Sequence, residues 1–459
     1  MSEVVVDRAE GALVPVRAFR EKDLADYLET APAFVKAFAE LSEFKAKAGQ
    51  LLVVPNETGG MAQALFGLGA AGDAQAFRAL AAKLPAGDYR LAAAPDDLAP
   101  DQVALAFALG SYRFDRYKKK GEKQPRLVVE GVDVAEVRQV AHACALARDM
   151  VNTPPNDMGP LQIETIAREI AEQYGARITV VTGEGLLEAN YPAVHAVGRA
   201  AAPHRAPRMI ELSWGEEGRP LVALVGKGVV FDTGGLDIKP SAGMRLMKKD
   251  MGGAAHVLAL GRMIMAAGLP VRLAVLVPAV ENAISGDAMR PGDVLESRKG
   301  LSIEVGNTDA EGRLILADAL TRAAELEPAL TLDLATLTGA ARAALGPQLP
   351  PFYTDDEELA GQIEAAMTAV SDPMWRMPLW KGYVDSLDSD VADVKNDSDA
   401  WAQAGSITAA LFLQKFAPPG PWAHFDIFAW NPRGRPGWPA GGEAQAIRAL
   451  YRMIRDRFA

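Results

Sequence analysis

The sequence has almost no cysteine. Its single cysteine, Cys144, has no partner in the chain, so an intramolecular disulfide is excluded. Cys144 lies in the apolar stretch AHACALA, which is typical of a buried, unreactive thiol in a helix rather than of a catalytic nucleophile. The near absence of cysteine also favours a reducing compartment.

Long hydrophobic runs are missing as well. No window of about 18 uninterrupted apolar residues occurs. The first residues, MSEVVVDRAEGALVPV, include acids where a signal peptide has a basic start followed by an apolar run. We therefore expect a soluble, cytoplasmic protein without a membrane partner.

Positive charge is in deficit, because 48 Lys and Arg face 59 Asp and Glu, for a net charge of −11. This balance argues against a protein whose main task is to coat nucleic acid or an anionic membrane. One basic run, 113–126, contains Lys118, Lys119 and Lys120 and leaves a DNA-binding role of the amino-terminal region as an alternative. We interpret this run as a solvated connector between domains, so nucleic acid is not an expected partner.

The overall composition is that of an ordinary globular chain, with 49% apolar and 23% charged residues among 459. It excludes whole-chain disorder and collagen-like repeats. At roughly 150 residues per domain the length allows about three domains. The motifs favour two, with residues 1–130 as a small α/β domain, 131–151 as a linker helix and 152–459 as a catalytic domain.

Beyond residue 152, strand-like and helix-like segments alternate. Apolar runs such as PLVALVGKGVVFD, VRLAVLVPAV and ALTLDLATLTG are separated by amphipathic stretches such as LQIETIAREIAEQYG and GAAHVLALGRMIMAAG. This alternation predicts an α/β domain with a mostly parallel central sheet and helices on both faces. Ligand sites in such sheets lie beyond the carboxyl ends of the strands.

Charged residues occur where turn residues are expected at these strand ends. Lys227 and Asp232 lie in the run VGKGVVFDTGG, Lys239 follows in IKPS, and Asp250 directly precedes a Gly-Gly helix start. The motif NTDAEGR then places Asp309, Glu311 and Arg313 just before a predicted helix.

Four carboxylates that converge on one cleft raise one another's pKa unless positive charge lies beside them. Two divalent cations would supply that charge, and a thiolate-free carboxylate set suits Zn²⁺, Mn²⁺ or Mg²⁺. Such an ion pair polarises a carbonyl group and activates a water molecule. A two-metal phosphatase or nuclease is an alternative, although such sites generally recruit histidines and phosphate-binding arginines.

Five successive blocks resemble the leucyl aminopeptidases, a dinuclear-metal family also called the cytosol aminopeptidases. These blocks are VGKGVVFDTGG, IKPS, MKKDMGGAA, NTDAEGRLILADAL and DLATLTGA, and they follow one another in the family's order. The resemblance covers roughly residues 140–459. It implies a metal-dependent aminopeptidase that hydrolyses the N-terminal residue of peptides, with leucine or another apolar residue preferred.

The resemblance also implies a role for each matching residue. Asp232 and Glu311 would bridge two metal ions, Lys227 and Asp250 would complete the tighter site, and Asp309 would complete the exchangeable one. As a ligand, Lys227 must be neutral, because an ammonium group has no lone pair to offer.

In the same way, Lys239 would stabilise the oxyanion of the tetrahedral intermediate, and Arg313 would hold a bicarbonate ion that acts as the general base. The substrate would need a free amino terminus. The residues that would line its binding pocket are Met247, Asn307, Ala310, Thr336, Leu337 and Gly339.

The sequence departs from the family pattern in two places. Phe428 replaces a small residue in the last block, which is usually Asp-Ile-Ala-Gly, and the tail NPRGRPGWPAGGEAQ is rich in Pro and Gly. The resemblance further implies a homohexamer and a macro-like amino-terminal domain. We interpret His256 as a packing residue and His424 as a core-strand residue bonded to the backbone.

Overall fold

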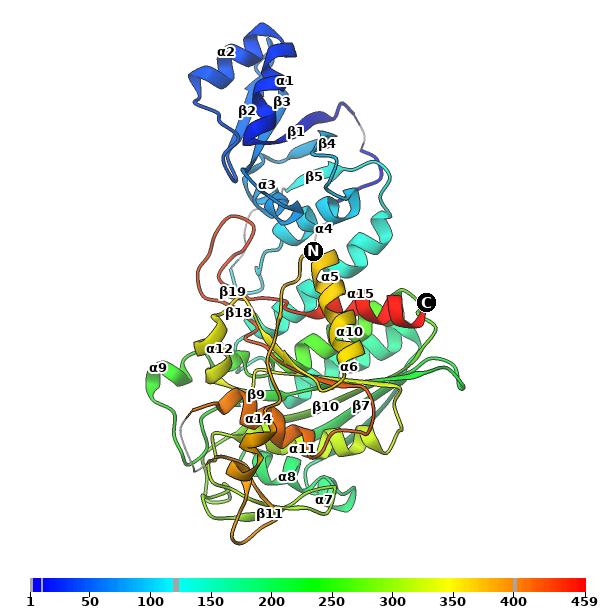
Figure 1. The fold of residues 1–459 in the computed structure, drawn as a ribbon, viewed down its shortest axis with the longest axis vertical. Helices are drawn as coiled ribbons and strands as arrows, with labels where there is room; N and C mark the ends of the chain where they lie inside the picture. The colour runs from blue at the N-terminus through cyan, green and yellow to red at the C-terminus, as the bar shows by residue number, and fades with distance from the viewer. Residues whose placement is uncertain (1–2, 10, 119–123, 399–402) are drawn as a thin grey trace. The chain divides into compact units, whose positions relative to one another are not determined.

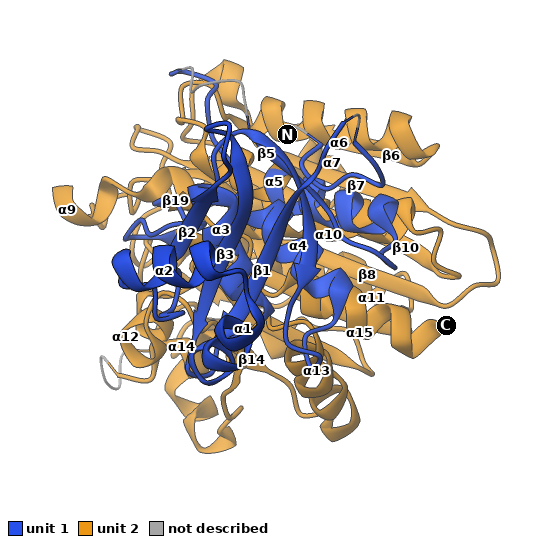
Figure 2. Ribbon diagram, turned by 90° about the horizontal axis from the view of Figure 1, so that it is seen from above, with its two compact units in different colours: residues 1–145, 431–440 blue, residues 146–430, 441–459 orange. Residues whose placement is uncertain are grey.

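The protein is an α/β protein with two compact units. A computed structural model describes residues 3–9, 11–118, 124–398 and 403–459 (Figure 1). Unit 1 comprises Met1–Ala145 and Asn431–Ala440, and unit 2 comprises Leu146–Trp430 and Gly441–Ala459 (Figure 2). Lys119 and Lys120 of the basic run lie outside the described residues.

Unit 1 contains a five-stranded sheet in the order β2-β3-β1-β4-β5, in which only β2 is antiparallel to its neighbour. Its core includes the fully buried Phe66, Phe77 and Phe107. The strands are β1 Val14–Arg20, β2 Leu51–Pro55, β3 Met61–Gly69, β4 Gly87–Ala93 and β5 Pro125–Val128. The helices are η1 Glu21–Asp23, α1 Leu24–Thr30, α2 Ala33–Leu41, η2 Ala74–Ala76, α3 Phe77–Lys83 and α4 Pro100–Gly110.

Part of the Pro- and Gly-rich tail also belongs to unit 1. Gly437 has a φ of +78°, and a Cβ atom there would lie 2.3 Å from the backbone of Arg78, so only glycine fits. The Arg78 guanidinium lies 5.0 Å from the centre of the Trp438 ring, and that of Arg435 lies 4.4 Å from it. These contacts order a segment whose sequence left its role open.

Unit 2 is built on a nine-stranded sheet in the order β15-β14-β17-β13-β8-β10-β7-β6, with β9 also paired to β10. The central strands β17, β13, β8 and β10 run parallel, which confirms the predicted mostly parallel sheet. The strands are β6 Arg177–Thr182, β7 Arg208–Trp214, β8 Leu221–Gly226, β9 Gly228–Asp232, β10 Arg272–Asn282, β13 Leu330–Ala335, β14 Pro351–Tyr353, β15 Trp375–Arg376 and β17 Trp422–Asp426.

Short strands complete the sheet structure. A three-stranded sheet has the order β11-β12-β16, and β18 pairs with β19. Their bounds are β11 Val294–Glu296, β12 Ser302–Glu304, β16 Val394–Lys395, β18 Trp430–Asn431 and β19 Gly441–Gly442.

Helices cover both faces of the large sheet, as predicted (Figure 1). One face carries α6 Pro160–Tyr174, α10 Gly252–Ala266 and α15 Ile447–Phe458, with α13 Glu357–Ala369 packed on α15. The other face carries α8 Pro192–Gly198, α11 Glu311–Ala324 and α14 Gly405–Gln414. The remaining helices are α5 Val134–Asn152, α7 Gly185–Glu188, η3 Pro203–Arg205, α9 Ser241–Met244, η4 Met247–Lys249, α12 Gly339–Leu345 and η5 Lys381–Leu387.

No helix among the described residues is both long enough and apolar enough to cross a bilayer.

The apolar run 220–232 forms two strands where its sequence suggested one. The break falls at Lys227, whose N–H donates to the Leu334 carbonyl of β13 (3.0 Å) and whose carbonyl accepts from Ala254 of α10 (2.8 Å). Because its main chain is bound on both sides, Lys227 is held at the end of β8 and its side chain is buried.

The prediction that His424 bonds to the backbone is wrong. His424 and Asp333 are direct neighbours on the parallel strands β17 and β13, and the imidazole Nδ1 lies 2.5 Å from Asp333 Oδ1. The other carboxylate oxygen accepts from Trp422 Nε1 at 2.7 Å. Burial lowers the pKa of His424, but Asp333 outweighs this effect and the net pKa is raised.

His256 is a packing residue, as predicted, and it is fully buried in α10. Its Nδ1 lies 2.6 Å from the Gly252 carbonyl, and its Nε2 lies 3.0 Å from the Gln445 N–H. These two partners suit the neutral tautomer that carries its proton on Nδ1, because Nε2 must then accept. Burial lowers the pKa of His256 to about 4.

We predict that His256 makes stability depend on pH. Its folded pKa of about 4 lies below the ordinary 6.5, so the contribution is complete above pH 6.5 and is lost as pH falls towards 4. At about 1.4 kcal/mol per unit of pKa, about 3 kcal/mol should be lost. Urea denaturation of the wild type and of His256→Gln between pH 4 and 7.5 measures the difference.

The exposed His204 provides the matched control for this experiment. The His204→Gln protein should keep the wild-type dependence of the unfolding free energy on pH. An identical dependence in the wild type and His256→Gln would contradict the assignment of the effect to His256.

Candidate metal centre

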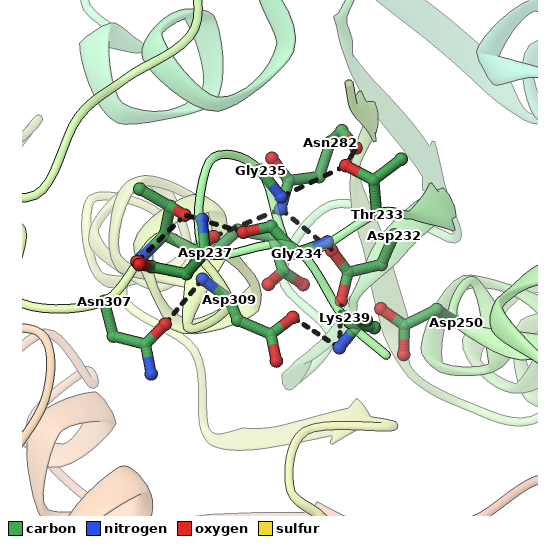
Figure 3. A network of polar contacts seen from close by, with 12 residues as sticks. Asp232, Thr233, Gly234, Gly235, Asp237, Lys239, Asp250, Asn282, Asn307 and Asp309 are labelled. Carbon is green, nitrogen blue, oxygen red and sulfur yellow. Dashed lines mark hydrogen bonds and ion pairs between the residues drawn. The ribbon is translucent and has the colours of Figure 1, made fainter. Parts of the chain in front are cut away.

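The charged residues singled out in the sequence lie together at the carboxyl edge of the central strands. Asp232 ends β9, Asp250 lies between η4 and α10, and the loop 307–310 leads into α11. Figure 3 shows Asp232, Asp250 and Asp309 with their side chains in one region, beside Lys239. The sheet positions them because parallel strands end at one edge.

Lys227 lies at the inner end of this cluster. Its Nζ lies 2.7 Å from Asp250 Oδ2, 2.9 Å from Glu311 Oε1 and 3.4 Å from the Thr336 carbonyl. Burial lowers the pKa of Lys227, but the surrounding carboxylates outweigh it and the net pKa is raised. With only protein groups around it, Lys227 is therefore an ammonium ion, and its neutral form belongs to a site in which cations replace that charge.

Lys239 lies at the outer end of the cluster (Figure 3). Its Nζ lies 2.8 Å from Asp232 Oδ2 and also forms an ion pair with Asp309. The Lys239 side chain is 15% exposed, which leaves its ammonium group within reach of a ligand in the cleft.

Three of the carboxylates fit the geometry of a metal site. One oxygen each of Asp232, Asp309 and Glu311 lies within 4.8 Å of the others. Burial, followed by repulsion from Asp232, raises the pKa of Asp309 to about 6 and that of Glu311 to about 8. A nearby cation would reverse these shifts by favouring the ionised forms.

The contacts of these carboxylates also support a metal site. Asp250 Oδ2, Asp309 Oδ1 and Glu311 Oε1 are buried oxygens, and their contacts among the described residues are ion pairs with Lys227 or Lys239. Each carboxylate oxygen has more lone pairs than one lysine contact uses. The residues present therefore fit divalent cations, because several hard oxygen donors gather in one buried cluster.

Asn282 orients one carboxylate, although sequence reasoning missed it. Its Nδ2 donates to Asp232 Oδ1 (2.8 Å) and to the Thr308 carbonyl (3.1 Å), and the Gly234 N–H donates to the same Asp232 oxygen (2.9 Å). These bonds leave Asp232 Oδ2 to pair with Lys239. The position of Asn282 at the end of the run VRLAVLVPAVEN was the available signal.

Asp237 and Thr308 connect two loops of the site. The Thr308 N–H donates to Asp237 Oδ2 (2.8 Å), and the Asp237 N–H donates to Thr308 Oγ1 (2.9 Å). Gly235, with a φ of +65°, lies against Thr308, and a Cβ atom there would come within 2.9 Å of its hydroxyl. The glycine is therefore needed for the close approach of the two loops.

Asn396 holds the loop that precedes α11. Its side chain accepts from the Gly306 and Asn307 N–H groups and donates to the Asn307 and Ala310 carbonyls. Its own carbonyl accepts from Arg313 Nη1 at 2.7 Å. Arg313 is buried, burial lowers its pKa, and its Nε has no hydrogen-bond partner among the described residues.

The pocket residues predicted after β13 lie beside Asp250. Thr336 Oγ1 donates to Asp250 Oδ1 (2.9 Å). Asp426 Oδ1 accepts from the Leu337 N–H (3.0 Å) and the Thr338 N–H (3.1 Å), so this carboxylate fixes the loop. Gly339 follows as the first residue of α12.

Met247 lies in η4, the turn that leads to Asp250. The last residue of that turn, Lys249, is 5% exposed, and its Nζ lies 5.2 Å from the centre of the Phe428 ring. The guanidinium of Arg342 lies 4.7 Å from the same ring centre. Phe428, the residue that departs from the family pattern, thus contacts two cations.

Comparison with known proteins agrees with this geometry. Residues 145–451 match the catalytic domain of the cytosol aminopeptidase family, and residues 14–130 match the N-terminal domain of M17 aminopeptidases. The chain belongs to the cytosol aminopeptidase family. As a member of this family it is a metal-dependent aminopeptidase, a hydrolase that acts on peptides.

Similar proteins of this family include curated and solved examples. A probable cytosol aminopeptidase of Syntrophotalea carbinolica is 44% identical over 75% of this chain and 73% of its own length. The cytosol aminopeptidase of Coxiella burnetii is 42% identical, with a TM-score of 0.94 over 100% of both chains. The bottromycin maturation enzyme BotP in complex with Mn is 36% identical, with a TM-score of 0.86 over 98% of this chain and 100% of its own.

Gly312 offers a test of the cluster in this cytosol aminopeptidase. A Cβ atom at residue 312 would lie 2.6 Å from Lys227 Cε and 2.8 Å from Nζ. We predict that Gly312→Ala displaces the lysine side chain and weakens binding of Mn²⁺ or Zn²⁺ by about 10- to 100-fold, as disturbed metal-site neighbours do. Titration calorimetry of the chelator-treated protein measures the affinity.

Gly361 of α13 is the control, because a Cβ atom there meets nothing within 4 Å. Gly361→Ala should bind metal as the wild type does and should be slightly more stable, since alanine favours a helix. Wild-type metal affinity in a folded Gly312→Ala protein would exclude the proposed role of this close packing.

Proposed function

We propose that the protein is a two-metal aminopeptidase that removes the N-terminal residue, leucine or another apolar residue by preference, from peptides with a free amino terminus. The observation that carries this proposal is the buried cluster in which oxygens of Asp232, Asp309 and Glu311 lie within 4.8 Å of one another. The fit of these donors to divalent cations and the family membership both support it.

In this proposal five residues hold the ions, which are Zn²⁺ or Mn²⁺ and less readily Mg²⁺. Asp232 and Glu311 would be shared by both ions, Lys227 and Asp250 would hold one, and Asp309 would hold the other. The short distances from Lys227 Nζ to Asp250 and Glu311 support their assignment to a common ion. When bound, the two ions polarise the scissile carbonyl and lower the pKa of a water molecule so that it can attack.

Two basic residues complete the proposed chemistry. Lys239 keeps its proton and donates a hydrogen bond to the substrate carbonyl oxygen, where negative charge develops. Its position between Asp232 and Asp309, on the exposed side of the cluster, supports this role. Arg313 holds bicarbonate, which would supply a general base, and its unpaired Nε supports that assignment.

The proposed substrate pocket is formed by the loops around Asp250 and Glu311. The side chains of Met247 and Leu337 give it apolar contacts, which favour an apolar first residue. Asn307, whose Oδ1 fixes the Asp309 N–H at 2.8 Å, and Thr336, which donates to Asp250, connect the pocket to the ligands. The other two proposed lining residues are Ala310 and Gly339.

We assign this catalysis to residues 152–459, with 131–151 as the linker helix and 1–130 as the amino-terminal domain. We further propose a homohexamer in the cytoplasm. Support comes from the name cytosol aminopeptidase that the relatives carry and from the similarity to them along most of the chain.

We predict two metal ions per chain and strict dependence on a free amino terminus. Chelator-treated protein that is given back Zn²⁺ or Mn²⁺ should release leucine from leucine amide and should not act on N-acetyl-leucine amide. Elemental analysis measures the ions, and chromatography measures the leucine. Equal turnover of both amides, or hydrolysis of a phosphate ester in their place, would contradict the proposal.

We predict that Lys239→Met lowers kcat by about 10²- to 10³-fold, because it removes a hydrogen bond to the developing oxyanion. KM should change little, and Lys239→Arg should recover part of kcat because it restores a donor. Steady-state kinetics on leucine amide give both constants, and elemental analysis of each variant verifies that two ions remain bound. Wild-type kcat in a metal-loaded Lys239→Met protein would exclude this role.

A further inference from the structure

Phe428 lies between two cations beside the proposed pocket. The ring centre is 5.2 Å from Lys249 Nζ and 4.7 Å from the Arg342 guanidinium. Phe428 stands where the family pattern has a small residue. The bulk of its ring and the two cations that contact it therefore distinguish the pocket of this chain from the family pattern. An aromatic face holds cations in place without neutralising their charge.

Lys249 has no hydrogen-bond partner that explains its burial. Its side chain is 6% exposed, and the nearest carboxylate oxygen, Asp250 Oδ1, lies 3.7 Å from Nζ. No hydrogen bond from Nζ is recorded among the described residues. Burial of an ammonium group is costly unless it is paired, and Asp250 is already committed to Lys227 and Thr336.

The other charges near Lys249 do not satisfy it either. Asp426 lies within electrostatic range, but its two oxygens accept from the Leu337 and Thr338 N–H groups and from the Thr338 and Ser406 hydroxyls. Lys227 and Arg342, the remaining charged neighbours, are both positive. Within the described residues, the one ion pair of Lys249 is therefore the long contact with Asp250 Oδ1 at 3.7 Å.

Lys249 lies close to residues that are proposed to bind the substrate side chain. Lys249 shares the turn η4 with Met247 and directly precedes Asp250. Phe428, whose ring Lys249 contacts, lines one small pocket with Thr338 and Arg342. Leu337 directly precedes Thr338 in the chain. A glutamate side chain, in which methylene groups end in a carboxylate, matches such a combination of apolar residues and a cation.

We propose that Lys249 is a specificity-determining residue that lets the enzyme accept peptides with an acidic first residue, glutamate above all, in addition to apolar ones. The inference rests on the proposed aminopeptidase function. The substrate carboxylate accepts a hydrogen bond from Lys249 Nζ, and Arg342, which also contacts the Phe428 ring, adds a second positive charge. Charge-assisted pairs of this kind are strong when solvent is excluded.

Glutamyl and glutaminyl p-nitroanilides test this proposal, because they have nearly the same shape and differ in charge. The wild-type holoenzyme should give a kcat/KM for the glutamyl substrate about 10-fold above that for the glutaminyl one. Lys249→Met should abolish or invert this ratio, whatever the absolute rates of the variant. A wild-type ratio of one or below, or a ratio unchanged in folded Lys249→Met, would overturn the proposal.

Arg245, an exposed cation just before the same turn, provides the matched control, and Arg245→Met should keep the wild-type ratio. If Lys249→Met does not fold, the exposed Arg342→Gln provides the second variant and should lower the ratio about threefold. Calorimetric binding of free glutamate and glutamine to the holoenzyme gives a readout apart from turnover, and glutamate should bind more tightly. Failure to hydrolyse either anilide or leucine amide would contradict the proposed function itself, whereas equal hydrolysis of both anilides would contradict this inference alone.

Discussion

Four carboxyl groups cannot remain ionised in one buried cleft unless positive charge lies among them, and the whole catalytic unit is organised around this constraint. Asp232, Asp250, Asp309 and Glu311 come from three separate segments, and the end of the parallel sheet brings them together. Lys227 pairs with Asp250 and Glu311 at the inner end, and Lys239 pairs with Asp232 and Asp309 at the outer end. Burial, followed by repulsion from Asp232, raises the pKa of Asp309 and of Glu311 even with these lysines present, and nearby divalent cations would favour the ionised carboxylates.

Around this centre a second set of polar groups orients each ligand. Asn282 fixes Asp232, Thr336 fixes Asp250, and Asn396 fixes the loop that carries Asp309 and leads to Glu311. Each of these partners uses one side of a carboxylate or loop and leaves the other side facing the cleft. Such partners tune metal sites as strongly as some ligands do. The buried side-chain amides of Asn282 and Asn396 are therefore as important to the arrangement of the centre as its charged groups.

The alternation of apolar and amphipathic runs was sufficient to predict the sheet, whereas the charged cluster was predicted from short motifs together with their resemblance to a known family. NTDAEGR places Asp309 and Glu311 before a buried helix, and VFDTGG places Asp232 at a strand end. The break at Lys227 was missed because it depends on hydrogen bonds to Leu334 and Ala254, which are distant in sequence. Asn396 and the pairing of His424 with Asp333 were missed for the same reason, since no local pattern predicts which polar side chains become neighbours across strands.

Residues 431–440 belong to unit 1 although they lie near the end of the chain, and this limits how the polypeptide can be cut into fragments. The chain contributes to unit 1 twice, once through its first 145 residues and again through ten residues near its end. A protease cut, or a gene fragment that begins after residue 145, would leave the Trp438 ring without the Arg78 cation that covers it. A single cleavage of the chain therefore cannot separate the two units, because each of them contains two segments of the polypeptide.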